Sequence, residues 1–207
     1  GRLGAIYGVR DQIRPQAKEN LARLKGLGVK NLIMLSGDNQ GTVDLVKNEL
    51  GLTEAYGNLL PEDKSDFVVA KIEEGYTVAF LGDGVNDSPS IALAQVGIAM
   101  GAGTDVAIET SDVVLMNSDI GRLPHALALA KATSRNMKQN IIIAVGVVLF
   151  LLVSLLVSDW MNMAVGMFVH EGSILAVILN GMRLMNFRLN KNSVPINKPN
   201  KNQIKTK

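Results

Sequence analysis

Short apolar runs that end at glycine or polar residues alternate with helical patterns along the first two thirds of the chain. Four of these runs predict β-strands, at 29–35, 77–82, 96–100 and 112–116. The helical patterns between them lie near 15–26, 40–50, 62–74 and 88–95. Proline stands where two of these helices begin, and glycine stands where three of them end. Nearly continuous apolar strands that alternate with helices indicate a parallel α/β sheet covered on both faces.

The last third of the chain changes to long apolar segments. Residues 139–158 carry no charge, and about 20 such residues are needed to cross roughly 30 Å of hydrocarbon. A second segment, 160–182, is also long enough, but it holds His170 and Glu171 near its centre. The alternative for the first segment is a buried core helix, which would normally show a polar stripe, and this segment has none. The pattern therefore predicts two transmembrane helices.

Charge is distributed unevenly along the 207 residues, although the net charge is only +2. Residues 1–182 hold 14 basic and 19 acidic side chains, whereas residues 183–207 hold seven basic and no acidic ones. Basic residues flank the apolar segments on their outer sides and are missing from the short link between them. The positive-inside rule therefore predicts a hairpin with both ends in the cytoplasm. The basic tail favours an anionic inner leaflet, so membrane lipid is an expected partner and nucleic acid is not.

Composition supports this division of the chain. Hydrophobic residues make up 47% and aromatic residues only 4%, which is typical of a soluble part averaged with a membrane part. The absence of cysteine excludes a disulfide scaffold, a thiolate metal site and a cysteine nucleophile within these residues. The chain begins at Gly1 without an apolar secretion signal, so we expect it to be an internal piece of a longer protein, or the product of a truncated gene.

The densest group of polar side chains lies in LGDGVND, residues 81–87. Asp83 and Asp87 are four residues apart across a turn that glycines permit, and Asn86 adds an amide oxygen. Hard oxygen ligands of this kind suit Mg²⁺, which keeps several waters and binds one or two protein carboxylates. The alternative is an Asx-rich turn that only caps the following helix.

Two further groups favour phosphate chemistry at the same edge of the sheet. Ser36, Gly37 and Asp38 end a predicted strand and place a hydroxyl and backbone N–H groups at a helix start, which suits an anion. Lys64 offers a point charge to a phosphate. Each group has a structural alternative, because Ser36 also suits a helix cap and Lys64 a solvated surface. Taken with the carboxylate pair, they make a phosphoryl-transfer site, where catalysis is positioning plus charge neutralisation.

Five motifs resemble the C-terminal third of the P-type cation-transporting ATPases, in the same order. They are DQIRP (11–15), MLSGDN (34–39), LLPEDK (59–64), GDGVNDSP (82–89) and GIAMGAGTDVAIETSDVVLM (97–116). The resemblance covers residues 3–189 and is greatest for the heavy-metal branch. It implies part of a haloacid-dehalogenase-like, Rossmann-like phosphorylation domain, followed by a two-helix transmembrane hairpin. It also implies Mg²⁺, ATP bound by a domain outside this chain, and a transported metal ion.

The resemblance implies a catalytic role for each residue that matches a motif. Asp83 resembles the Mg²⁺ ligand, and Asn86 and Asp87 resemble the residues that hold the phosphate and Mg²⁺ in place. Lys64 resembles the lysine that contacts the phosphoryl group. Ser36 stands where the family usually has threonine, so the hydroxyl is kept.

The remaining motif positions are Gly37 and Asp38, which match the family, and the DQIRP segment. Asp11 and Arg14 resemble the motif at the hinge to the nucleotide-binding domain. The family's usual residues are replaced at three positions outside the proposed Mg²⁺ shell, so we expect little loss from these changes. The three positions are Ser88, Ser90 and Gln95.

The family nucleophile is the aspartate of an Asp-Lys-Thr-Gly-Thr motif, which this sequence does not contain. An aspartyl phosphate therefore cannot form on this chain alone, and we expect the chain alone to be inactive. The implied partners are the remaining parts of the ATPase, namely the nucleotide-binding and actuator domains and the earlier spans. Two alternatives remain open. One is a membrane-anchored haloacid-dehalogenase-type phosphatase, which would need its own Asp-x-Asp upstream of residue 36, and the other is a non-catalytic remnant.

His170, Glu171 and Ser173 lie at membrane depth in the second apolar segment. An ionisable pair there is costly, so it indicates a transport site, with a structural hydrogen bond to a neighbouring helix as the alternative. Imidazole and carboxylate suit a divalent transition metal such as zinc, cobalt or cadmium. The segment resembles the last span of the cobalt/zinc/iron-type subgroup of metal ATPases.

We therefore expect five parts. They are a partial phosphorylation domain at 1–123, a helical connection at 124–138, transmembrane helices at 139–158 and 160–182, and a basic cytoplasmic tail at 183–207. One unbroken helix from about 124 to 157 is expected to carry small motions into the membrane. The expected function is ATP-driven export of a divalent transition metal through an aspartyl phosphate, in a bacterial plasma membrane.

Overall fold

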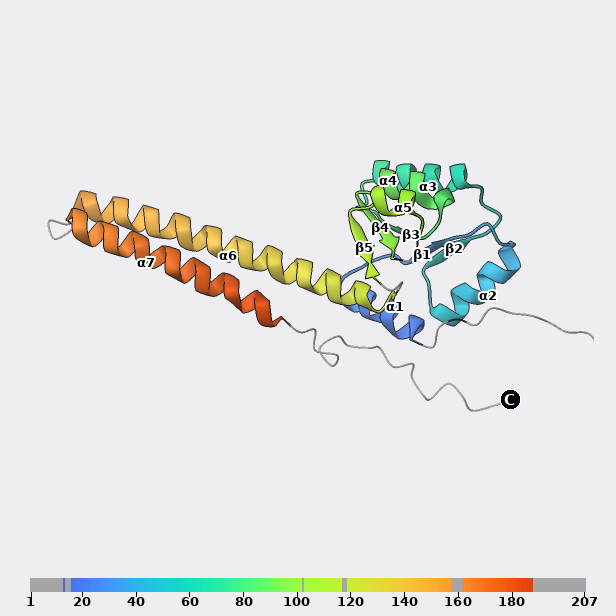
Figure 1. Cartoon of the computed structure of the whole chain (residues 1–207), viewed down its shortest axis with the longest axis horizontal. Helices are drawn as coiled ribbons and strands as arrows, with labels where there is room; N and C mark the ends of the chain where they lie inside the picture. The colour runs from blue at the N-terminus through green and yellow to red at the C-terminus, as the bar shows by residue number, and fades with distance from the viewer. Residues whose placement is uncertain (1–12, 14–15, 102, 117–118, 158–161, 188–207) are drawn as a thin grey trace, which may run out of the picture. The chain divides into compact units, whose positions relative to one another are not determined.

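The computed structural model describes residue 13 and residues 16–101, 103–116, 119–157 and 162–187. This part of the chain divides into two units, one ending at Pro124 and one beginning at His125. The first unit contains strands and helices, and the second is built from long helices (Figure 1). Several sequence predictions lie outside the described residues, namely the hinge residues Asp11 and Arg14, the short link between the two apolar segments and most of the basic tail.

The strands of the first unit all pair in parallel, as predicted. β1 (Ile33–Leu35) pairs with β2 (Glu54–Tyr56). β3 (Ala79–Gly82) pairs with β4 (Val96–Met100), and β4 pairs with β5 (Val113–Leu115). Figure 1 shows the order β5-β4-β3-β1-β2, but no ladder joins β1 to β3 among the described strands. The sequence predicted one continuous sheet, whereas the described strands form two separate ladders.

Helices cover both faces of these strands, which confirms the predicted α/β architecture. Figure 1 shows α3, α4 and α5 on one side of the strands and α1 and α2 on the other. The bounds are α1 (Ala17–Gly26), α2 (Gln40–Leu50), α3 (Pro61–Glu73), α4 (Ser88–Leu93) and α5 (Asp105–Glu109), with a 3-10 turn, η1 (Val85–Asp87), before α4.

Local sequence explains where the helices near the candidate site begin and end. The side chain of Asn39 accepts a hydrogen bond of 2.9 Å from the backbone N–H of Thr42 and so caps α2. Gly51 ends α2 with φ 70°, in the left-handed region that favours glycine. Pro61 is the first residue of α3, where its missing N–H costs nothing.

Two elements were not predicted, and three predicted strands are shorter than expected, the one at 29–35 most of all. β2 has three residues and α5 has five, which is too short for a hydrophobic period to be recognised. The apolar run from 29 begins as a loop, because Leu32 exchanges hydrogen bonds with Thr53 ahead of the ladder. Strand β1 therefore starts only at Ile33.

The core of the first unit lies between α4, α5 and β4. Residues 83–87, which we call the acidic loop, come directly before α4. Ile91 of α4 is only 1% exposed and packs with Ala99 of β4 and Ala107 of α5. Gly97 of β4 allows this packing, because a Cβ there would lie 2.5 Å from the backbone oxygen of Ile91. Full burial of a side chain of this size stabilises a fold by about 1.5–3 kcal/mol, so it anchors α4 behind the acidic loop.

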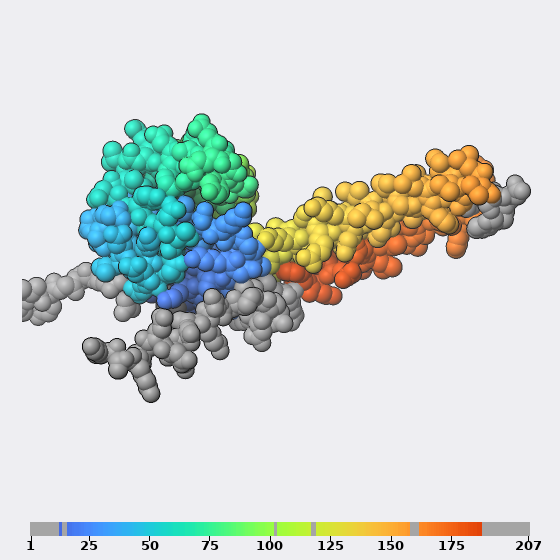
Figure 2. Space-filling model, turned by 180° about the vertical axis from the view of Figure 1, so that it is seen from behind, coloured from blue at the N-terminus to red at the C-terminus, as the bar shows by residue number. Residues whose placement is uncertain are grey.

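The second unit is a helical hairpin. Its helices are α6 (Arg122–Val157), which begins just before the unit boundary, and α7 (Met163–Met182), followed by a 3-10 turn, η3 (Arg183–Asn186). The helices lie side by side and run antiparallel (Figures 1 and 2). Both are long and apolar enough to cross a membrane. The most apolar stretch of each helix is not buried within the described part of the protein. The predicted unbroken helix from about 124 to 157 is confirmed.

Candidate functional site

The loop after β1 is held in a tight turn by its own side chains. The hydroxyl of Ser36 donates to Oδ2 of Asp38 at 2.9 Å, and the backbone N–H of Asp38 donates to the same hydroxyl oxygen at 3.1 Å. Ser36 is half-buried, whereas Gly37 and Asp38 are exposed. The loop therefore presents a fixed hydroxyl and carboxylate beyond the carboxyl end of β1.

A second loop, which follows β2, fastens the first. The backbone N–H of Asn58 donates to the carbonyl of Asp38 at 2.6 Å, and the backbone N–H of Leu59 donates to the carbonyl of Ser36 at 3.0 Å. Gly57 makes this approach possible, because a Cβ there would lie 2.7 Å from the carbonyl oxygen of Asp38. Asn58 adopts φ 57°, a left-handed conformation that asparagine tolerates well.

The acidic loop follows β3. Its residues 85–87 form η1, which leads directly into α4. Gly82 is buried, and a Cβ at this position would lie 2.6 Å from Cβ and 3.1 Å from Cγ of Asp87. The side chain of Asp87 therefore lies against the backbone at the end of β3. Only glycine leaves room for this arrangement.

Lys64 connects α3, the helix after the second loop, to the acidic loop. Its Nζ lies 2.8 Å from Oδ1 of Asp87, and each side chain is only 16% exposed. Lys64 stands in the first turn of α3. This helix begins at Pro61, directly after the loop whose Leu59 N–H donates to the carbonyl of Ser36. The structure thus brings Lys64 and Asp87 into contact, and Ser36 follows the carboxyl end of β1 in the other ladder.

Asp83 and Asn86 are exposed beside this ion pair. The carbonyl of Asp83 accepts a hydrogen bond of 3.2 Å from the backbone N–H of Thr104. Among the described residues, the Asp83 carboxylate has neither a hydrogen bond nor an ion pair. A free carboxylate, an amide oxygen and a second carboxylate are the donor set that Mg²⁺ takes from proteins. The residues present therefore fit Mg²⁺.

Sequence reasoning missed several residues that support the site. Gly57 is one of them, and Gly103 is another, since a Cβ there would lie 2.8 Å from the carbonyl oxygen of Asp83. The hydroxyl of Ser90, which is fully buried, lies 3.2 Å from that of Ser65 and joins α4 to α3 next to Lys64. A glycine shortly after a predicted strand was an available signal for Gly103, whereas Gly57 follows a strand that the sequence did not predict. No local signal reveals a hydroxyl pair 25 residues apart.

The side chain of Gln95 lies away from the acidic loop. Its Oε1 accepts a hydrogen bond of 2.6 Å from the backbone N–H of Val78. Val78 precedes β3, so this contact is at the end of the strand opposite to Asp83. The position agrees with the expectation that this departure from the family pattern lies outside the Mg²⁺ shell.

The predicted membrane ligands lie on α7. His170 and Glu171 are exposed on the hairpin, and Ser173 is half-buried. The hydroxyl of Ser173 donates to the carbonyl of His170 at 2.6 Å, within the helix. No group of three or more His, Cys, Asp or Glu side chains that could hold a metal ion occurs in the described part of the chain.

Residues 1–95 match the haloacid dehalogenase-like hydrolase family. Their parallel strands, the acidic loop after β3 and the lysine that reaches it place the first unit in this class of α/β folds.

The chain as a whole is similar to metal-transporting ATPases. It is 41% identical over 182 residues to a probable cadmium-transporting ATPase of Alkalihalophilus pseudofirmus, which covers 87% of this chain and 25% of the relative. It is 40% identical over 184 residues to a zinc-transporting ATPase of Bacillus subtilis, covering 89% of this chain and 29% of the relative. The chain thus spans about a quarter of the length of these curated relatives.

A solved structure agrees with these relatives. The crystal structure of a zinc-transporting PIB-type ATPase in its E2.Pi state has a TM-score of 0.78 and 38% identity, and the match covers 85% of this chain and 28% of that one. The chain belongs to the heavy-metal branch of the P-type ATPases.

Proposed function

We propose that this chain supplies the Mg²⁺- and phosphate-binding half of the phosphorylation domain of an ATP-driven heavy-metal exporter, with part of its membrane metal site. The observation that carries the proposal is the Lys64–Asp87 ion pair, 2.8 Å long, beside the exposed Asp83. The pair places a cation and two carboxylates beyond the carboxyl end of β3, and the Ser36 hydroxyl stands beyond the carboxyl end of β1. Phosphoryl transfer requires groups of these kinds, which position the phosphate and neutralise its charge.

Each side chain has a proposed task at the phosphate. Asp83, with Asp87 and Asn86, would hold Mg²⁺, which neutralises charge on the transferred group when it is bound. Lys64 would share its charge between Asp87 and the phosphoryl oxygens. The Ser36 hydroxyl and the backbone N–H groups of Gly37 and Asp38 would donate hydrogen bonds to those oxygens.

The nucleophilic aspartate has to come from outside this chain, because the sequence has no Asp-Lys-Thr-Gly-Thr motif. The missing ladder between β1 and β3 supports a place for it. A parallel strand that pairs with both would join the two ladders into one sheet. Its carboxyl end would bring an aspartate between Ser36 and Asp83. For this reason we expect the chain alone to form no aspartyl phosphate and to hydrolyse no ATP.

The metal site is proposed at His170, Glu171 and Ser173. Consecutive residues of a helix point about 100° apart, so one ion reaches both His170 and Glu171 only where the helix opens. Gly172 lowers the cost of such an opening, since glycine adopts non-helical conformations readily. Further ligands would come from helices outside this chain. Imidazole and carboxylate favour a divalent transition metal, and relatives are named for cadmium and zinc.

We place the hairpin in a bacterial plasma membrane with both termini of the segment in the cytoplasm. The two apolar helices and the names of the bacterial relatives support the membrane location. The basic residues outside the spans support the orientation. Asp11 and Arg14 would lie at the hinge to the nucleotide-binding domain, and ATP would bind to that domain.

The test is phosphorylation of the full-length ATPase that carries this sequence. Asp83→Ala should abolish turnover of the phosphoenzyme, whereas His170→Ala should remove metal stimulation and leave phosphorylation from inorganic phosphate intact. The purified chain itself should show no phosphatase activity. Such activity, lost in Asp83→Ala, would favour the membrane-anchored phosphatase over the transporter.

A further inference from the structure

Three asparagines form a closed ring of hydrogen bonds between α6 and α7. Nδ2 of Asn136 donates to the backbone carbonyl of Asn180 at 2.7 Å, and Nδ2 of Asn180 donates to Oδ1 of Asn140 at 2.8 Å. Nδ2 of Asn140 then donates to Oδ1 of Asn136 at 3.2 Å. Each side-chain NH₂ group therefore donates to the next member of the ring. The acceptors are the side-chain oxygens of Asn136 and Asn140 and the backbone carbonyl of Asn180. We call these residues the asparagine ring.

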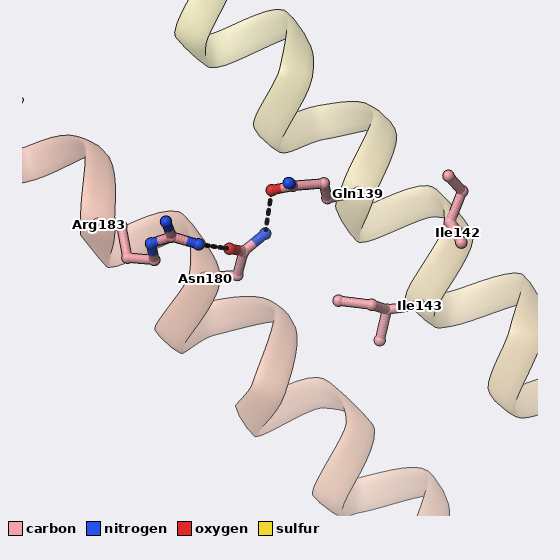
Figure 3. A pocket seen from close by; sticks show the side chains of 5 residues that line it. All are labelled: Gln139, Ile142, Ile143, Asn180 and Arg183. Atoms are coloured by element: carbon pink, nitrogen blue, oxygen red, sulfur yellow. Dashed lines mark hydrogen bonds between the residues drawn. The ribbon is translucent and has the colours of Figure 1, made fainter.

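The ring is partly buried and continues to a cation. Asn136 is only 8% exposed. Figure 3 shows Asn180 between Gln139 and Arg183, whose guanidinium donates to Oδ1 of Asn180 at 3.2 Å. The amide of Asn180 also approaches Oε1 of Gln139 at 3.4 Å, which is a long contact at the edge of the ring. The carbonyl of Asn180 lies in the last turn of α7, where intrahelical donors run out, and Asn136 supplies one.

The remaining surfaces of the hairpin contain little that specifies how the helices are aligned along their axes. On α6, residues 141–153 have no side chain that forms hydrogen bonds, and neither do residues 163–169 and 174–179 of α7. Apolar helices in lipid can slide by a turn with little change in packing, because lipid tails are as apolar as the side chains. A buried asparagine between helices is known to select one alignment, since every other alignment leaves its amide unpaired.

We infer that the asparagine ring is a positioning device that sets the axial register of α7 on α6 and so the depth of the His170–Glu171 turn. The inference rests on the proposed function for the role of these two residues. His170 lies ten residues from Asn180, which is about 15 Å along the helix. A slip of one turn would move His170 by about 5.4 Å, which is more than twice the length of a metal–ligand bond. In the register that the ring sets, His170 lies at about the depth of the apolar residues 146–150 of α6.

Register can be measured on this chain directly, because it contains no cysteine. Two engineered pairs, Leu149→Cys with Met167→Cys and Ile141→Cys with Leu175→Cys, use exposed positions at similar depths on the two helices. Spin labels on each pair, in the chain reconstituted into nanodiscs, report the distance between α6 and α7. Asn136→Leu and Asn140→Leu should each shift or broaden the distance distribution of both pairs. Asn136→Leu should have the larger effect, since it also uncaps Asn180.

Gln139→Leu is the matched control, because it removes an amide from the same helix turn but only the long contact. Its distances should stay as in the parent chain. Unchanged distributions in both asparagine variants, or equal changes in Gln139→Leu, would overturn the inference. If Asn136→Leu fails to insert, Asn140→Leu against Gln139→Leu still decides it, with helical content by circular dichroism as the check on folding.

A functional measurement separates positioning from general stability. In the full-length ATPase, Asn140→Leu should raise the metal concentration for half-maximal activity about tenfold or more, while phosphorylation from inorganic phosphate stays unchanged. Equal loss of both activities would mean a structural role only and would overturn the positioning role. The proposed metal site fails separately, if His170→Ala keeps full metal stimulation while the label distances still respond to the ring variants.

Discussion

Nζ of Lys64 lies 2.8 Å from Oδ1 of Asp87, and this ion pair joins the start of α3 to the end of the acidic loop. The two residues are 23 positions apart, and each arrives from a different loop at the same edge of the sheet. Since both side chains are only 16% exposed, solvent screens the pair less than a surface pair. It is therefore a joint in the fold as well as a candidate part of the phosphate site.

Removal of the lysine should loosen this joint. Lys64→Ala leaves Asp87 without its cation, and we expect local opening of α4 to become easier by about 1–2 kcal/mol. Hydrogen exchange of the α4 amides, followed by mass spectrometry, measures this change. Lys71→Ala is the control, because its ion pair with Glu74 lies at the surface, where solvent screens it, and its loss should leave the protection of α4 unchanged. Equal protection of α4 in Lys64→Ala and the parent chain would contradict the prediction.

A methyl group at Gly82 should displace Asp87. The new Cβ would lie 2.6 Å from that of Asp87, so the carboxylate must move by a sizeable fraction of an ångström. Displacements of this order cost about a hundredfold in rate when they misplace a catalytic group. Gly82→Ala in the full-length ATPase should therefore lose most phosphoenzyme turnover. Gly84→Ala is the matched control, since its Cβ would meet no atom closer than 3.9 Å, and a similar loss there would refute the steric explanation.

The membrane ligands should act on metal dependence alone. His170→Ala and Glu171→Ala should each abolish stimulation of ATP hydrolysis by Zn²⁺ or Cd²⁺, because each would remove a proposed donor to the metal. Phosphorylation from inorganic phosphate should survive, since we propose that the first unit, and not the hairpin, takes part in that reaction. Met167→Ala, one helical turn away and exposed, is the control. Unchanged metal stimulation in both ligand variants would reject the site.

Tyr56 should ionise at higher pH than a free tyrosine. Its hydroxyl donates to Oε2 of Glu54 at 2.7 Å, and this hydrogen bond, followed by burial and the charge of Glu54, raises the pKa of Tyr56 above 10.0. The protonated form is favoured in the folded state. Its stabilising contribution is therefore complete below pH 10 and disappears as the pH rises through the raised pKa.

Phenolate absorbance checks this prediction. A difference titration between the parent chain and Tyr56→Phe isolates Tyr56 from the other tyrosines. In Glu54→Gln the hydrogen bond loses its charge, so the Tyr56 phenolate should form at lower pH than in the parent. A titration midpoint that does not move in Glu54→Gln would show that Glu54 is not the cause.

Much of the fold was predictable from local pattern. The helices α1 to α4 follow their apolar periods and their proline and glycine ends, and the second half of α6 follows a long uncharged run that begins at residue 139. The strands β2 and β5 illustrate the limit. Both have three residues, but β5 lies in a clear apolar run, whereas Glu54 and Tyr56 of β2 are not apolar side chains of a buried strand. Pairing with β1 creates β2, and pairing is not a local property.

The candidate site divides in the same way. Chemistry of the residues and their order in the motifs were enough to single out Ser36, Lys64 and Asp83, because carboxylates, a lysine and a hydroxyl after apolar strands have few other uses together. Distances between loops depend on how strands pair and which backbones touch. The approach of Gly57 to Asp38, the Ser65–Ser90 contact and the asparagine ring between α6 and α7 are all of this kind. Each joins residues that the chain keeps apart until packing brings them together, so composition and spacing along the chain contain no record of them.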